Sequence, residues 1–193
     1  ARPAFPPRRS SALVGEPPPR PSVLRAAVRA AKAAADDVID VDLALLRLDE
    51  ALPADRIVVT DLGRFVTTAW LAFPVRAPEC LIHTVNFAAI GCGLGEAIGA
   101  AIGGAIGGEG QPAVLIAGDG GFMLSGLSEI ATAVREELDL TIVICNDASY
   151  GAEHVQFTNR AMDPSLSMIG SPDFAAIGRA LGAAGVTVRS TAD

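Results

Sequence analysis

Two short apolar segments dominate the hydrophobic pattern of the chain. Residues 114–117 and 140–145 carry no charge and are rich in β-branched side chains, which is typical of strands buried on both faces of a parallel sheet. Between them, residues 124–137 repeat apolar side chains at helical spacing, as at Ile130 and Val134. The pattern therefore predicts one right-handed strand–helix–strand unit.

Similar patterns continue this unit along the chain. Residues 56–60, 80–83 and 186–188 predict further strands, and residues 172–183 predict a helix. We therefore expect an α/β fold, in which an open parallel sheet carries helices on both faces.

The first quarter of the chain has a different pattern. Residues 1–22 hold seven prolines and predict a linker or disordered tail. Residues 23–53 predict linker helices, the first over residues 23–35 and the second beginning at Asp40. We place the main domain at residues 54–193 and expect it to be incomplete at its C-terminus.

A long segment without other charges surrounds Glu96. Its length, residues 88–108, is compatible with a membrane helix. However, Ala and Gly contribute little to membrane insertion. We favour a helix of a soluble protein that a glycine-rich turn at residues 91–95 opens, and whose small side chains let it pack closely on the sheet.

Composition and charge restrict the function further. The net charge is −7, and Lys and Arg form no cluster beyond residue 35, which argues against binding to nucleic acid or to anionic membranes. Cys80, Cys92 and Cys145 show no paired spacing. They are expected to be reduced cysteines of a cytoplasmic protein rather than disulfide or zinc ligands.

Both apolar segments of the central unit end in oxygen-rich loops. The first ends at Gly118-Asp119-Gly120-Gly121, and the second ends at Asn146-Asp147-Ala148-Ser149-Tyr150-Gly151. The carboxyl ends of parallel strands meet at one edge of a sheet, where ligands bind. Carboxylates together with glycines that let a phosphate approach the backbone suit Mg²⁺ carrying a diphosphate.

These two loops, at this separation, resemble the thiamine-diphosphate fingerprint of the superfamily of acetolactate synthase, benzoylformate decarboxylase and pyruvate decarboxylase. The resemblance extends over roughly residues 54–190. It implies the thiamine-diphosphate-binding fold and a C-terminal pyrophosphate-binding domain of a lyase or transferase. It also implies thiamine diphosphate and Mg²⁺ as cofactors, with ylid chemistry on a 2-oxo acid.

The resemblance implies roles for individual residues. Ile90 would be the apolar wedge that bends the cofactor, and backbone groups near Ala88 and Ile90 would hold its pyrimidine edge. The diphosphate and metal loops would comprise Gly118, Asp119, Gly120, Gly121, Asn146, Asp147, Ser149, Tyr150 and Gly151. Among these, the metal ligands would be Asp119, Asp147 or Asn146, and the carbonyl of Ser149.

The second loop departs from the family, because Asp147 stands where a second asparagine is usual. The spacing of 27 positions from Asp119 favours Asn146 as the metal ligand, with the carbonyl of Ala148. The position of Tyr150 favours Asp147 instead and requires one extra residue near 127–129. We favour Asp147.

If the second loop is aligned so that Asp147 is the metal ligand, Glu153 corresponds to a glutamate that contacts the reacting group in pyruvate-type decarboxylases. A carboxyl group in a partly desolvated cleft has a raised pKa and could relay a proton. Glu153 could instead simply complement a helix dipole.

Asp61 either faces the cofactor cleft or closes a strand. His83 either reaches the substrate or has a hydrogen-bonded structural role.

The sequence therefore predicts part of a thiamine-diphosphate enzyme that needs a pyrimidine-binding domain, from the same or another chain, and that forms a homo- or hetero-oligomer. Residues before Arg56 leave no room for such a domain. Two alternatives remain, a non-catalytic α/β module that binds phosphate or nucleotide, and an inactive fragment.

Overall fold

The computed structural model describes residues 39–84, 88–106 and 110–190. The tail predicted at residues 1–22 and the helix predicted at residues 23–35 lie outside the described residues.

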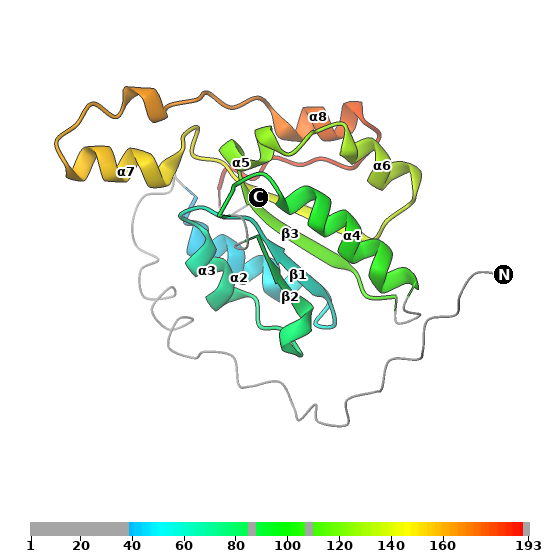
Figure 1. Ribbon diagram of the computed structural model, residues 1–193. Helices are drawn as coiled ribbons and strands as arrows, with labels where there is room; N and C mark the ends of the chain where they lie inside the picture. Colours follow the sequence, from blue (N-terminus) through cyan, green and yellow to red (C-terminus); the bar gives the residue numbers. More distant parts are fainter. Residues whose placement is uncertain (1–38, 85–87, 107–109, 191–193) are drawn as a thin grey trace.

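The core of the fold is a parallel sheet of four strands in the order β2-β1-β3-β4 (Figure 1). The strands are β1 (Ile57–Thr60), β2 (Leu81–His83), β3 (Ala113–Gly118) and β4 (Leu140–Cys145). In the register of the sheet, Thr60 lies beside Ile116 and Gly118 lies beside Cys145. The predicted α/β class and the four strands are confirmed, and the ends of β3 and β4 are adjacent.

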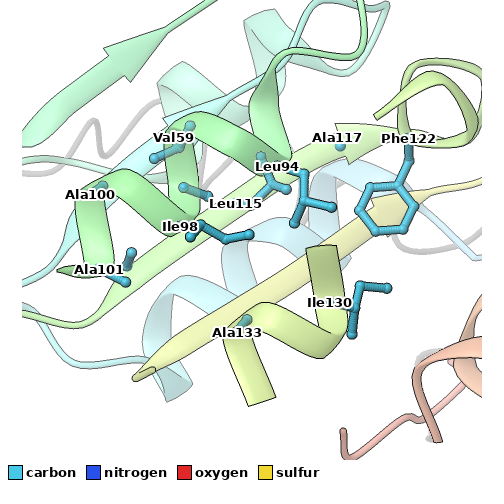
Figure 2. Packing of buried hydrophobic residues seen from close by; sticks show 12 residues of the cluster. Val59, Leu94, Ile98, Ala100, Ala101, Leu115, Ala117, Phe122, Ile130 and Ala133 are labelled. Carbon is cyan, nitrogen blue, oxygen red and sulfur yellow. The ribbon is translucent and has the colours of Figure 1, made fainter. Parts of the chain in front are cut away.

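One face of the sheet packs on α4 (Gly93–Ile106), α6 (Glu129–Arg135) and α8 (Phe174–Ala180). Leu115 and Val59 point into this layer, where they meet Leu94, Ile98 and Ile130 (Figure 2). Because side chains alternate along a strand, the intervening residues of β1 and β3 face the opposite layer, as the burial of Val58, Val114 and Ile116 there shows.

The opposite layer consists of α2 (Val41–Ala51) and α3 (Val66–Ala72). Asp40 caps α2, because its side chain accepts a hydrogen bond from the Leu43 amide at 3.1 Å. Leu45 and Leu46 are buried against the sheet. The helix predicted from Asp40 is therefore confirmed, and it packs with the domain that follows it.

A buried ion pair also joins α2 to the first strand. The Arg56 guanidinium donates to the carboxylate of Asp49, and both side chains are almost fully buried. Arg56 also donates to the Pro53 carbonyl at 2.5 Å and lies over the ring of Phe73 at 5.3 Å.

Two predicted elements differ in the structure. The helix predicted at residues 124–137 is shorter, because α6 begins only at Glu129. A separate helix, α5 (Asp119–Leu124), ends where the predicted helix begins, and Gly126 between the two has φ 72°. Residues 186–188 form no strand, and Val186 is exposed. A strand needs a neighbour for its backbone hydrogen bonds, and within the described residues no strand pairs with this segment.

The remaining elements are short. The 3₁₀ helix η1 (Pro78–Cys80) precedes β2, and the 3₁₀ helix η2 (Ser165–Ser167) precedes α8. Helix α7 (Gly151–Asn159) projects beyond the sheet (Figure 1). The longest described helix, α4, has 14 residues. Within the described part of the chain, no helix is long and apolar enough to cross a membrane.

Candidate cofactor site

The candidate site lies where β1, β3 and β4 end. Asp119 is the first residue of α5 and is 2% exposed. Its Oδ2 accepts a hydrogen bond from the Ser171 hydroxyl at 2.6 Å. A helix that begins directly at the end of a strand thus holds this carboxylate at its own N-terminus, where negative charge is stabilised.

The second loop turns sharply at the end of β4. Asn146 Oδ1 accepts from the Ala148 amide at 3.0 Å, and Ala148 has φ 56°. Asp147 Oδ1 accepts from the Ser149 amide at 3.2 Å and from the Ser149 hydroxyl at 2.9 Å. Both side chains are exposed, so each also has oxygen available for a ligand.

A distant segment fixes the far side of this loop. The Tyr150 amide donates to the Ser167 carbonyl at 2.8 Å, and the Ile169 amide donates to the Ala148 carbonyl at 3.1 Å. The Ser167 hydroxyl is 3.0 Å from Nδ1 of His154 on α7. These hydrogen bonds hold the start of α7 beside the end of β4.

Three of the predicted site glycines lie where a side chain would not fit easily. A Cβ on Gly120 would lie 2.8 Å from the Tyr150 ring. A Cβ on Gly121 would lie 3.2 Å from Asp61 Oδ2 and 3.4 Å from Cβ of Ile90. A Cβ on Gly151 would collide with Asp147 Oδ2. The structure therefore brings the loops of Ile90, Asp119 and Asp147 together.

Asp61 supports this arrangement from the end of β1. It is fully buried and accepts from the Leu62 amide at 2.7 Å, the Thr84 hydroxyl at 3.1 Å and the Gly91 amide at 2.9 Å. Its carboxylate thus joins three segments, and through Gly91 it holds the loop that carries Ile90. These donors match the interpretation in which Asp61 closes the strand.

His83 has the hydrogen-bonded environment of a structural residue. Its Nδ1 lies 2.9 Å from the Thr60 hydroxyl and 3.1 Å from the Thr60 carbonyl. The ring of Trp70 contacts it edge to face, with the centroids 4.8 Å apart. The two remaining predicted residues, Glu153 and Ala88, are exposed, Glu153 as the third residue of α7 and Ala88 with φ 48°.

The carboxylates at the strand ends affect neighbouring groups. Burial, together with Asp147 and Asp119, raises the pKa of the Cys145 thiol to about 12. Burial and the nearby Asp61 raise the pKa of Glu96, an effect that His83 partly opposes. Glu96 Oε2 is buried without a hydrogen-bond partner in the described chain. The site is therefore a negatively charged edge of the sheet.

The oxygen atoms offered here suit a hard cation that also binds a phosphate. The described residues contain no group of three or more His, Cys, Asp or Glu side chains placed to hold a metal ion. The donors are instead two carboxylates, one amide and the carbonyls of the second loop. Mg²⁺ is commonly bound in this way, by one or two carboxylates and by phosphate oxygens, with water completing the octahedron.

The chain is similar to proteins of a known family. A family model described as "Thiamine pyrophosphate enzyme, C-terminal TPP binding domain" matches residues 61–193. IlvB2 of Mycobacterium tuberculosis is 34% identical over 183 residues, which are 94% of this chain and 31% of that protein. The acetolactate synthase isozyme 2 large subunit of Escherichia coli is 30% identical over 150 residues, 76% of this chain and 26% of the relative.

Solved structures show the same fold. The benzoylformate decarboxylase of Polynucleobacter necessarius superposes with a TM-score of 0.70 at 23% identity, over 77% of this chain and 28% of that chain. The present chain thus spans less than a third of the length of each of these proteins.

Proposed function

Because the chain belongs to the thiamine pyrophosphate (thiamine diphosphate) enzyme family, as its C-terminal cofactor-binding domain, we propose that it binds Mg²⁺ and thiamine diphosphate for a 2-oxo acid decarboxylase or acetohydroxyacid synthase-like enzyme. One observation carries the proposal. Asp119 and the Asn146–Asp147 pair follow adjacent strand ends, and a helix begins at Asp119 and at Gly151.

Each part of the cofactor has its own residues. Asp119 and Asp147 would hold Mg²⁺ together with the Ser149 carbonyl, and Asn146 would replace Asp147 if the second loop is aligned the other way. The diphosphate would lie along Gly118, Gly120, Gly121 and the segment Ser149, Tyr150 and Gly151. Gly151 begins α7, whose first amide groups lack partners within the helix and favour an anion.

The pyrimidine half would meet the loop that Asp61 holds in place. Backbone groups at Ala88 and Ile90 would hold the pyrimidine edge, and the Ile90 side chain would support the bent cofactor. The position of Ile90 supports this role, because a Cβ on Gly121 would lie 3.4 Å from Ile90 Cβ, which places the wedge beside the diphosphate loop. When bound, the cofactor supplies the carbanion chemistry.

Glu153 is the proposed proton-relay residue. It lies two residues after Gly151 on the first turn of α7 and is exposed to solvent. A carboxyl group there could hold or release a proton beside the reacting centre once a partner domain covers the cleft.

The proposed setting is a cytoplasmic oligomer. A pyrimidine-binding domain, from the same or another chain, would complete the cleft, and the substrate would be a 2-oxo acid. The partial coverage of the relatives by this chain supports the need for a further domain.

The site assignment is tested by replacing Asp119 with Asn, which removes the charge and keeps the size of the side chain. We expect Asp119→Asn to lower the affinity for thiamine diphosphate with Mg²⁺ by at least about 100-fold, since even outer residues of metal sites commonly cost 10–100-fold. Isothermal titration calorimetry measures this loss, and circular dichroism confirms the fold.

Asp139→Asn is the matched control, because Asp139 is exposed at the amino end of β4, at the opposite edge of the sheet. Unchanged cofactor affinity in Asp119→Asn would refute the site. Titration with Mg²⁺ and ATP tests the alternative of a nucleotide-binding module. Binding of ATP in preference to thiamine diphosphate would favour that alternative.

A further inference from the structure

Arg64 lies at the candidate site, although no motif pointed to it. The loop that follows β1 is fixed at both ends, by the hydrogen bonds of Asp61 and by the buried ring of Phe65. A Cβ on Gly118 would lie 3.1 Å from Phe65 Cε1. Arg64 therefore extends from a loop that is held over the end of β3.

The aliphatic part of Arg64 reaches the first residue of α7. A Cβ on Gly151 would lie 3.2 Å from Arg64 Cδ, and the same Cβ would collide with Asp147 Oδ2. Arg64 and Asp147 thus both approach Gly151. The Arg64 side chain is exposed and makes no hydrogen bond or ion pair with the residues that the structure describes.

The charges around Arg64 are otherwise negative. Residues 61–65, 118–121 and 146–151 contain three carboxylates and only one cationic side chain, that of Arg64. An anionic ligand at Gly151 would be repelled by Asp147. A guanidinium at the same point offsets that repulsion, and its planar donors match the oxygens of phosphate or carboxylate.

We propose that Arg64 balances the charge of Asp147 and binds an anionic oxygen group of the ligand beside Gly151. This inference rests on the proposed function for the identity of that ligand. The group is either a phosphate of thiamine diphosphate or the carboxylate of the 2-oxo acid. In both cases the guanidinium acts together with the amide groups at the start of α7.

A double-mutant cycle tests the proposal by calorimetry on the 193-residue chain with Mg²⁺. The variants are Arg64→Gln, Asp147→Asn and the combination of both, and the probes are pyrophosphate, thiamine diphosphate, thiamine and pyruvate. Arg160→Gln is the control, because Arg160 is an exposed arginine at the other end of α7. The control should bind every probe like the wild type.

We expect Arg64→Gln to weaken the binding of pyrophosphate and thiamine diphosphate about tenfold and to leave thiamine unaffected. In the Asp147→Asn background the same change should cost about threefold or less, because interacting charges give non-additive effects. If Arg64→Gln weakens only pyruvate binding, with the same dependence on Asp147, the anionic group is the substrate carboxylate.

Two results would overturn the role of Arg64. One is wild-type affinity of Arg64→Gln for all anionic probes, and the other is an equal loss in the wild-type and Asp147→Asn backgrounds. A wild-type chain that binds pyrophosphate but not thiamine diphosphate would refute the proposed function alone. A wild-type chain that binds none of the anionic probes would refute both.

Discussion

Asn146 and Asp147 make similar local hydrogen bonds, yet they differ in charge. Each accepts from an amide two residues ahead, and only Asp147 has an oxygen facing the first residue of α7. Its carboxylate attracts a divalent cation more strongly than an amide does. Charge therefore favours Asp147 over Asn146 as the metal ligand.

We therefore predict that Asp147→Ala weakens Mg²⁺-dependent cofactor binding about tenfold more than Asn146→Ala, a difference of about 1.4 kcal/mol. Titration of Mg²⁺ at a fixed concentration of thiamine diphosphate measures both losses. The reverse ranking would move the metal to Asn146. It would also weaken the role assigned to Glu153, which depends on the same alignment of the second loop with the family.

Other residues of the site could not be found from the sequence. Ser171, which donates to Asp119, lies 52 positions away from it. Arg64 and Ser167 likewise reach the second loop only through the packing of distant segments. Single polar residues in loops carry no periodic pattern, whereas the two loops with Asp119 and Asp147 follow recognisable strands.

The strands were the most predictable elements, because runs of buried β-branched residues are distinctive. The helices after them were less so. The sequence places residues 118–121 in a loop, but α5 already begins at Asp119 with Gly118 as its N-cap. Apolar spacing alone also did not reveal the break at Gly126, which results from a backbone conformation that glycine adopts readily.

Two glycines of helices provide a matched test of the packing at the site. Gly120 on α5 faces the Tyr150 ring, whereas a Cβ on Gly99 in α4 would meet nothing within 4 Å. We predict that Gly120→Ala lowers the free energy of unfolding by about 1–3 kcal/mol through overpacking. Gly99→Ala should raise it by about 0.5–1 kcal/mol, because alanine is the better helix former.

Urea unfolding measures both changes. Equal effects of the two substitutions would show that Tyr150 is not packed against α5, and the arrangement of the second loop would then need revision.

At the scale of the whole molecule, α2 raises the question of where the domain begins. The predicted boundary at residue 54 excludes α2, yet Leu45 and Leu46 are buried against the sheet and Asp49 pairs with Arg56 in the core. Removal of one partner from a buried ion pair is costly, because it leaves an uncompensated charge.

We predict that a chain beginning at residue 54 is less stable than a chain beginning at residue 39 by at least about 3 kcal/mol in urea unfolding, because Arg56 then lacks its carboxylate. Arg56→Met in the chain that begins at residue 54 is the control and should recover part of the loss. Equal stability of the two unsubstituted chains would support the boundary at residue 54.

The last prediction concerns activity. The proposed function requires a pyrimidine-binding domain to complete the cleft, and the 193 residues span only 31% of IlvB2 and 26% of the acetolactate synthase subunit. Met123 and Leu124 on α5 are exposed, and Leu124 lies next to the Gly91 turn. Exposed apolar side chains beside a polar site are typical of a surface that another domain covers.

We therefore expect the isolated chain to bind thiamine diphosphate with Mg²⁺ but to show no detectable decarboxylation of pyruvate or benzoylformate. Addition of a pyrimidine-binding domain from a related enzyme should produce turnover, and the Asp119→Asn variant should remain inactive in the same mixture. Turnover by the isolated chain, abolished by Glu153→Gln, would show that Glu153 supplies the proton transfer without a partner domain. In that case the chain would hold a complete proton-transfer system, and its exposed α5 surface would need another explanation.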